Sequence, residues 1–355
     1  MPRRLPLAVL LVAASALAAC EGLQKLQVST NATTGEVLWT MDWDRDPEFE
    51  KTTVVAPLET ADSIAGESQL KQVTSLESGM VLLSFDIHYE RPEILMSLLE
   101  GIEGRSSQRY ANIWITQVDG AMDRKSRITE GKSLDLTPTY VRGEEAILFS
   151  SNRVSSAFQI FKKRLQGGGG LTLITNQNSQ DVFPQIDPTT GEMMLFTQVR
   201  EASSGNGILW MRAIEGGAPT QVGEGEEARW SPDGKQILYT AFSESSGKRQ
   251  LWVRSVEGGQ PEQITTGDYN NQSPCWSPDG KRIVFASDRA TTPEGKPNFD
   301  IWIIDADGKR DPQQLTGSTA YDDNPRWLDS DTIVFRSNRG QTWNIWSLKL
   351  SQAGG

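Results

Sequence analysis

The sequence repeats a unit of related residues six times, at intervals of 42 to 50 residues. In the two clearest copies, Arg229–Lys235 and Cys275–Lys281, the run Trp-Ser-Pro-Asp-Gly-Lys leads into an apolar triplet. An apolar pair containing Trp follows, and each copy ends in Ile-Thr or Leu-Thr. A repeat of this length forms one supersecondary unit that cannot bury its apolar face alone, so neighbouring units stack on each other.

The apolar positions of the repeat show where its strands lie. The triplet recurs at 81–83, 147–149, 194–196, 237–239, 283–285 and 333–335, and the pair at 113–114, 160–161, 209–210, 251–252, 301–302 and 345–346. These runs are apolar on both faces, as is typical of sheets covered on both sides. Pro-Asp-Gly before the triplet is typical of a tight turn, because Pro fixes φ and Gly supplies a positive φ. We predict four strands per unit, named A to D in chain order.

Six units of four short strands predict an all-β fold, a six-bladed β-propeller of four-stranded blades. The run from Pro274 to Arg289 resembles the Pro-Asp propeller repeat of the TolB family, which propellers of prolyl-oligopeptidase-like enzymes share. The resemblance covers roughly residues 70 to 350. Blade six departs from it at 328–331, and blades one to three lack the Ser-Pro-Asp-Gly run. The resemblance is specific for the fold and says little about activity.

The ring must close without a strand after residue 350. We predict that residues 69–74 form strand D of blade six, because they resemble 312–316 and precede blade one. Blade one is the least regular unit, with too few residues between Thr74 and Val81 for an ordinary strand A. Its connection from Leu83 to Trp114 is long, and Pro92 and Gly101 delimit a predicted short helix that either folds onto the propeller or serves as a docking patch.

The N-terminus resembles a bacterial lipoprotein signal. Arg3 and Arg4 precede an apolar stretch, and Leu17-Ala18-Ala19-Cys20 resembles the lipobox. The resemblance implies cleavage after residue 19 and lipidation of Cys20, which would anchor the chain to a membrane. Glu21 in place of Asp favours the outer membrane over the inner one.

The predicted organisation is therefore a signal peptide at 1–19, a tether with little regular structure at 20–68, the propeller at 69–350 and a tail at 351–355. One strand is expected in the tether, at Val37–Asp42. The net charge of −11 makes nucleic acid and anionic lipid poor partners.

Residues suited to catalysis or to metal binding are few. The single histidine, His88, lies in the long connection of blade one and is expected to be solvated. After lipidation of Cys20, Cys275 is the remaining cysteine, and we expect a buried, unreactive thiol. The glycine run 167–170 has no following helix and is expected to be a turn. We predict no catalytic residues, no bound metal and no cofactor.

Polar residues occur at equivalent positions just before or at the start of the A strands. The D–A loops approach the axis of a propeller, so these residues predict a binding surface at the channel mouth. The predicted binding residues are Asp135, Asp181, Glu226, Asn271, Asp322 and Asp323. A competing interpretation pairs the acids with Arg153, Arg289 and Arg339, which end B strands on the same face.

These observations favour a scaffold over an enzyme. TolB-family propellers bind partner proteins in the cell envelope, so the resemblance implies a protein or peptide partner at the channel mouth. We expect a monomer on the periplasmic side of the outer membrane. The alternative is a lactonase-like hydrolase or cyclase whose metal is held by the carboxylates of the channel mouth.

Overall fold

The structure is a computed structural model that describes most of the predicted propeller and two strands before it. The described residues are 23–30, 37–43, 70–77, 80–100, 110–118, 125–166, 170–175, 179–199, 206–292, 295, 297–340 and 342–350. Residues 1–22, which include the predicted signal peptide and Cys20, lie outside this set, as do 167–169 of the glycine run and the tail at 351–355.

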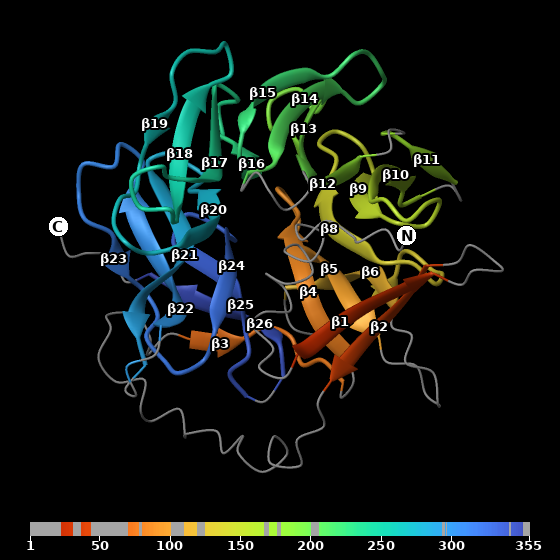
Figure 1. The fold of residues 1–355 in the computed structure, drawn as a ribbon, viewed down its shortest axis with the longest axis horizontal. Helices are drawn as coiled ribbons and strands as arrows, with labels where there is room; N and C mark the ends of the chain where they lie inside the picture. The colour runs from red at the N-terminus through yellow and green to blue at the C-terminus, as the bar shows by residue number, and fades with distance from the viewer. Residues whose placement is uncertain are drawn as a thin grey trace.

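Six antiparallel sheets of four strands surround one axis, which confirms the predicted six-bladed propeller (Figure 1). Blade one contains β4 (Met80–Ile87), β5 (Glu93–Glu100), β6 (Tyr110–Gln117) and β7 (Ser126–Arg127). Blade two contains β8 (Asp135–Tyr140), β9 (Ala146–Ser151), β10 (Gln159–Arg164) and β11 (Leu171–Leu173). Blade three contains β12 (Gln180–Ile186), β13 (Met193–Val199), β14 (Ile208–Ala213) and β15 (Thr220–Glu224).

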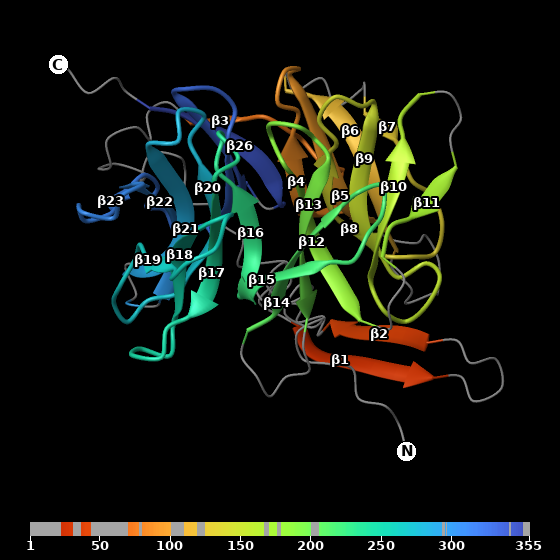
Figure 2. The same ribbon diagram turned by 90° about the horizontal axis from the view of Figure 1, so that it is seen from above.

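The remaining blades repeat the same order of strands. Blade four contains β16 (Glu226–Trp230), β17 (Gln236–Phe242), β18 (Arg249–Ser255) and β19 (Glu262–Gln263). Blade five contains β20 (Asn271–Trp276), β21 (Arg282–Thr291), β22 (Pro297–Asp305) and β23 (Gln313–Gln314). Blade six contains β24 (Asp322–Trp327), β25 (Thr332–Ser337), β26 (Asn344–Lys349) and β3 (Leu70–Gln72). Figure 2 shows the blades from the side.

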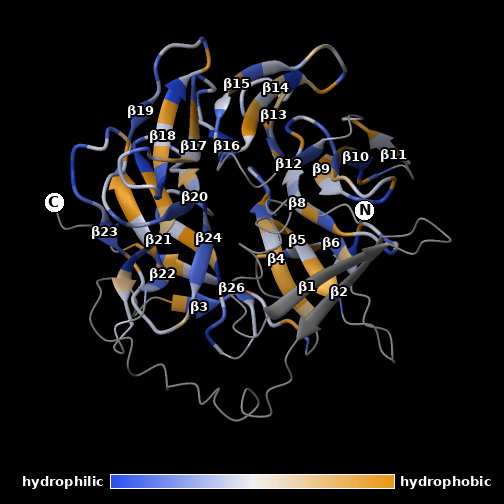
Figure 3. Cartoon of the chain, viewed as in Figure 1, coloured by the Kyte–Doolittle hydropathy of each residue, from blue (hydrophilic) through white to orange (hydrophobic). Residues whose placement is uncertain are grey.

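The strand β3 closes the ring as predicted. It pairs antiparallel with β26, so that Leu70 lies opposite Leu348 and Gln72 lies opposite Trp346. The A strands β4, β8, β12, β16, β20 and β24 contact one another in a closed circle around the axis. Hydrophobic residues are concentrated in the strands of the blades, whereas many of the connecting loops are hydrophilic (Figure 3).

Blade one corrects the prediction of a helix at 92–101. Residues 93–100 form β5, which pairs with β4 on one side and with β6 on the other. The six residues from Ile94 to Leu99 are all buried, because blades six and two cover both faces of this sheet. This two-sided burial outweighs the good helix propensity of Leu, Met and Glu. The segment at 81–83 consequently belongs to strand A and not to strand B.

Two strands precede the propeller. β1 (Leu23–Thr30) and β2 (Val37–Trp43) form an antiparallel hairpin. β2 matches the strand predicted at Val37–Asp42, whereas β1 was not predicted. The sequence-based expectation of a tether with one strand is therefore incomplete.

Candidate functional site

The threonines that follow the D strands tie strand D to strand C of the same blade. In five blades, this threonine hydroxyl accepts a hydrogen bond from a backbone N–H of the neighbouring C strand at 2.9–3.0 Å. The five residues are Thr129, Thr175, Thr265, Thr316 and Thr74. Because all five are buried, their hydroxyls satisfy backbone groups that water cannot reach. The repeated Ile-Thr or Leu-Thr in the sequence is explained by this bond.

The predicted binding residues lie in the seams between blades. Asp135 and Asp322 are fully buried, and Asp135 pairs with Arg153 at 2.6 Å while Asp322 pairs with Arg339. Asn271 is also fully buried, and its side-chain oxygen accepts a hydrogen bond from Arg289 at 3.2 Å. Burial raises the pKa of Asp322, and Arg339 opposes that shift.

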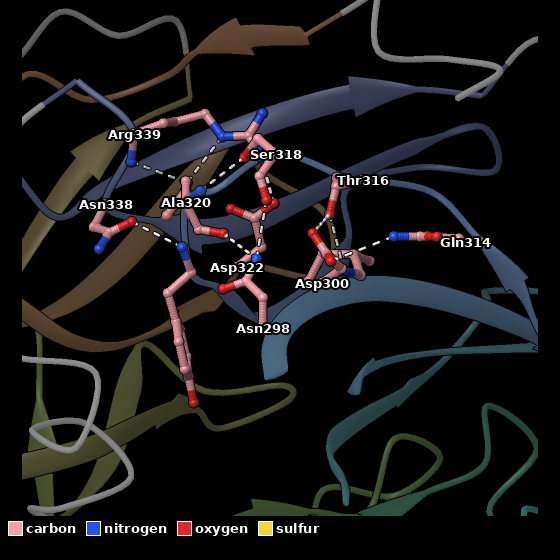
Figure 4. A network of polar contacts seen from close by, with 12 residues as sticks. Asn298, Asp300, Gln314, Thr316, Ser318, Ala320, Asp322, Asn338 and Arg339 are labelled. Carbon is pink, nitrogen blue, oxygen red and sulfur yellow. Dashed lines mark hydrogen bonds and ion pairs between the residues drawn. The ribbon is translucent and has the colours of Figure 1, made fainter. Parts of the chain in front are cut away.

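Figure 4 shows the seam between blades five and six in detail. Thr316 Oγ1 lies 3.4 Å from Asp300 of strand C, and Asn298 donates to the carbonyls of Ser318 and Ala320 in the loop before Asp322. Asn298 of blade five therefore holds the loop that leads into strand A of blade six.

The other three predicted residues are placed differently from one another. Glu226 pairs with Arg249 of its own blade at 2.7 Å. Asp323 is buried against the guanidinium of Arg336, and Asp181 is 2% exposed with Ser179 as a hydrogen-bond donor at 2.9 Å. The six residues thus do not converge on one open surface. Their geometry is that of the competing interpretation, in which acids pair with arginines, and their role in binding a partner stays a prediction.

A ring of five other residues lines the axis at the same end of the A strands, and the sequence analysis missed it. Each adopts a positive φ of 48–55° and is half-buried, and the pairing of its strand with strand B shifts register there. The five residues are Thr137, Phe183, Glu227, Ser273 and Asn324. We call them the bulge ring. A positive φ is unfavourable for Thr, Phe, Glu and Ser and better tolerated by Asn, so four of the five residues adopt a conformation that their type disfavours.

Four members of the bulge ring precede a proline, and this signal in the sequence could have identified them. Residues before proline avoid the right-handed helical region, so an X-Pro step inside strand A indicates local irregularity. Neighbouring members also contact each other, since Glu227 accepts hydrogen bonds from the N–H of Ser273 at 2.6 Å and from its hydroxyl at 3.2 Å.

Charged side chains meet across the axis further along the A strands. Asp86 of blade one lies 3.9 Å from Arg229 of blade four and 3.8 Å from Arg326 of blade six. Blades one and four are on opposite sides of the ring, so the Asp86–Arg229 contact crosses the channel. Thr139 donates to Asp86 at 2.8 Å and Arg229 donates to Gln185 at 2.8 Å, which adds blades two and three. We call these five residues the axial cluster.

Burial sets the electrostatics of the two carboxylates nearest the axis. It raises the pKa of Asp86, while Arg229 and Thr139 act in the opposite direction. Burial likewise raises the pKa of Glu227, against the hydrogen bonds from Ser273 and the charge of Arg249. Each carboxylate already has protein donors, which is the arrangement of a structural acid rather than of a nucleophile or base awaiting a substrate.

His88 corrects a further prediction. It is 9% exposed rather than solvated, and its Nδ1 accepts hydrogen bonds from the N–H groups of Glu90 and Arg91 at 3.0 Å. Its ring lies between those of Tyr89 and Tyr140. Burial lowers the pKa of His88, so the neutral form that accepts these bonds is favoured. The residue shapes the turn between β4 and β5.

The described residues offer little for metal or thiol chemistry. Among them, no three His, Cys, Asp or Glu side chains are grouped closely enough to hold a metal ion. The Cys275 thiol is in strand β20, and burial raises its pKa, which disfavours the reactive thiolate.

No helix in the described part of the chain is long and apolar enough to cross a membrane.

Known proteins share this architecture. Residues 227–354 match the sequence profile described as the TolB beta propeller domain. TolB from Acinetobacter baumannii superposes with a TM-score of 0.52 at 21% identity, over 68% of this chain and 60% of that one. The putative TolB from Agrobacterium tumefaciens gives 0.50 at 21% identity, over 62% of this chain and 75% of that one. Over residues 227–354 the chain is therefore similar to TolB-type propellers, and these solved structures share its β-propeller fold.

Enzymes share the fold as well. The hydrazine synthase of Kuenenia stuttgartiensis superposes on this propeller with a TM-score of 0.54 at 15% identity, over 68% of this chain and 41% of that one. At such identities the likeness concerns the fold and not the chemistry. No curated protein sequence matches the chain.

Proposed function

We propose that this TolB-like propeller is a lipid-anchored scaffold on the periplasmic side of a bacterial membrane, and that it binds a protein or peptide at the channel mouth. The bulge ring is the observation that carries the proposal. Five half-buried residues with a positive φ occupy equivalent positions in the A strands, and four residues of the axial cluster lie two positions further along the same strands. A ring of four polar residues and one aromatic residue with defined backbone conformations suits an extended polypeptide, since little ordering is needed on binding.

The charge of the chain supports a cationic or amide-rich partner segment. The net charge is −11, and Glu227 places a carboxylate in the bulge ring itself. An acidic surface attracts basic segments and speeds their arrival, and salt weakens that attraction. We infer that the partner dissociates more readily as ionic strength rises above about 0.15 M.

A change in the bulge ring should reduce partner binding without unfolding the protein. In the variant with Ser273→Gly and Asn324→Gly, glycine accepts the positive φ at no steric cost, so the fold is retained. We expect at least about a fivefold loss of the proteins recovered by crosslinking and affinity capture from cell envelopes, equivalent to roughly 1 kcal/mol. Lys281→Ala in a turn at the opposite face is the matched control. Unchanged recovery by the glycine variant at an unchanged melting temperature would show that the bulge ring is not the binding surface.

The anchor has its own test. Cys20→Ser removes the thiol that the predicted lipidation requires, so we expect the variant to leave the membrane fraction or to remain uncleaved. Membrane fractionation and the mass of the mature N-terminus measure both results. A cleaved Cys20→Ser protein that still sediments with membranes would contradict the proposed anchor.

A further inference from the structure

The turn between strands A and B of blade one has a histidine where four other blades have an aspartate. His88 directly follows β4, and its Nδ1 accepts hydrogen bonds from the N–H groups two and three residues later, both at 3.0 Å. Asp187 directly follows β12 in blade three, and its carboxylate accepts from the N–H groups at the same two offsets, at 2.9 and 3.2 Å. The A–B turns of blades four, five and six also have an aspartate that accepts from a backbone N–H, namely Asp233, Asp279 and Asp329. Since the sequence contains one histidine, blade one is the single blade that uses an imidazole for this purpose.

The two kinds of acceptor respond differently to acid. Burial alone would raise the pKa of Asp187, but the hydrogen bonds from Thr190 and Thr189 bring this pKa below its ordinary value. The blade-three turn therefore keeps its acceptor throughout the mildly acidic range. A neutral imidazole accepts a hydrogen bond at one ring nitrogen, whereas an imidazolium accepts at neither. Protonation of His88 therefore converts Nδ1 into a donor that faces two backbone donors.

The surroundings of His88 favour the neutral ring near pH 7. Burial lowers the pKa of His88 below the ordinary value of about 6.5, and the charge of Arg91 acts in the same direction. Three carboxylates oppose this shift, those of Glu93, Glu145 and Glu90. Tyr89 stacks on the imidazole at 4.4 Å between centroids, and Tyr140 of blade two meets its edge at 4.6 Å. An aromatic face attracts a cation, but it cannot replace the two hydrogen bonds that Nδ1 loses on protonation.

The same turn contacts the A–B turn of blade two, residues 141–145. Arg91 donates two hydrogen bonds to the carboxylate of Glu145, at 2.9 and 3.1 Å. The Tyr89 hydroxyl accepts a hydrogen bond from the N–H of Gly143 at 3.0 Å. Both side chains come within three residues of the histidine, so the conformation of its turn positions them against the neighbouring blade.

We propose that His88 is an acid-sensitive latch between blades one and two. With a neutral imidazole the turn is closed and holds Tyr89 and Arg91 against blade two. An imidazolium releases the two N–H groups, so the turn opens and this part of the A–B face loses its contacts with Gly143 and Glu145. The closed turn binds the proton more weakly than the open one, so opening becomes more frequent as the pH falls below the ordinary pKa of histidine. The latch lies at the opposite end of the A strands from the bulge ring, and it does not depend on the proposed scaffold function.

Hydrogen exchange of the full chain between pH 5 and 8, read by mass spectrometry and corrected for the intrinsic rate at each pH, tests the latch. Peptides covering 86–94 should show an opening equilibrium that rises by up to about tenfold per pH unit below about 6.5, because one proton binds on opening. Peptides around Asp187 are the control within the same molecule, and their corrected exchange should not depend on pH. The NMR signal of the one histidine should titrate below 6.5.

Two variants separate the titrating group from the contacts that it supports. Asparagine has a side-chain oxygen that accepts hydrogen bonds and does not titrate, so His88→Asn should keep the turn closed at every pH and abolish the pH dependence. Tyr89→Phe removes the hydroxyl that accepts from Gly143, so opening should increase at every pH while its pH dependence is retained. If His88→Asn does not fold, the titration of the natural chain and the exchange of Tyr89→Phe still test the proposal.

Three results would overturn the latch. The first is a histidine signal that titrates at or above 6.5. The second is corrected exchange whose pH dependence is the same around His88 and around Asp187. The third is a folded His88→Asn variant with the pH dependence of the natural chain. Partner capture by the bulge-ring variant concerns the other face of the propeller, so the scaffold function and the latch can fail separately.

Discussion

Replacing Arg336 by methionine is expected to lower the free energy of unfolding by about 3–5 kcal/mol, because the change leaves a buried carboxylate without its cation. Arg336 is 2% exposed, and its Nε donates to Asp323 at 2.7 Å. Its Nη1 donates to the carbonyls of Leu82 and Leu83 at 3.0 Å each, so one side chain of blade six satisfies backbone groups of blade one. The variant loses these contacts at the seam where the ring closes. Chemical denaturation of the purified protein measures the change.

Two further variants separate burial from charge. Arg310→Met removes an arginine that is 84% exposed and should leave the free energy of unfolding nearly unchanged, since exposed ion pairs contribute little. Adding Asp323→Leu to Arg336→Met should recover part of the lost stability, because the double variant leaves no unpaired charge in the protein interior. Equal effects of Arg336→Met and Arg310→Met would contradict this account of the seam.

The number of blades and the position of the closing strand were predictable because the repeat has a steric origin. Apolar triplets fill the space between blades, so their positions recur in the sequence wherever a middle strand is covered on both sides. The terminal threonine recurs because its hydroxyl satisfies a buried N–H of strand C in the same blade. Val73-Thr74 carries this second signal before blade one, and it therefore indicates the strand that completes blade six.

Blade one could not be predicted in detail, because its sequence satisfies two patterns. The segment Glu93–Glu100 has good helix formers and also a continuous apolar run, and only the neighbouring blades decide between them. His88 was misplaced for the same reason, since its burial depends on Tyr140 of the next blade. Contacts between residues far apart in the sequence leave no local pattern from which the burial of such a side chain could be predicted.

The binding residues predicted from the sequence and the bulge ring lie at the same end of the A strands, and the role of either set in binding stays a prediction. Equivalent positions in the repeat identified Asp135, Asp181 and Asp322 as a set, but repetition does not distinguish a seam from a channel lining. Asp135 and Asp322 pair with Arg153 and Arg339 at the ends of the B strands, as in the competing interpretation. The bulge ring lies two residues after these acids in the A strands and is defined by its backbone conformation. The prolines that follow Thr137 and Asn324 were the signal for it in the sequence.

Deleting residues 69–74 is expected to have the largest effect on the fold, because it opens the ring. β3 supplies the outer partner of β26, and Val73 donates its N–H to Ile345 at 2.8 Å while its side chain is buried between blades six and one. Burial of a valine side chain alone is worth about 1.5–3 kcal/mol. Thr74 adds a hydrogen bond to Asn344 at 3.0 Å, and its loss would leave the N–H of Ile345 unsatisfied. We expect a lower melting temperature and concentration-dependent aggregation through the exposed edge of β26.

A second variant moves residues 69–74 to the other end of the chain instead of deleting them. It tests whether stability depends on the pairing of β3 with β26 or only on where this segment lies in the sequence. A chain in which residues 69–74 are transferred behind Leu350, through a copy of the loop 306–312 that joins strands C and D in blade five, should regain the parental melting temperature as a monomer. The transferred strand would then follow β26 as β23 follows β22, and the same backbone pairs with Trp346 and Leu348 would form. Lys71→Ala, which removes an exposed side chain and keeps the backbone, is the control that should not change stability. A deletion variant as stable and monomeric as the parent, or a transferred strand that restores nothing, would show that β3 does not hold the ring closed.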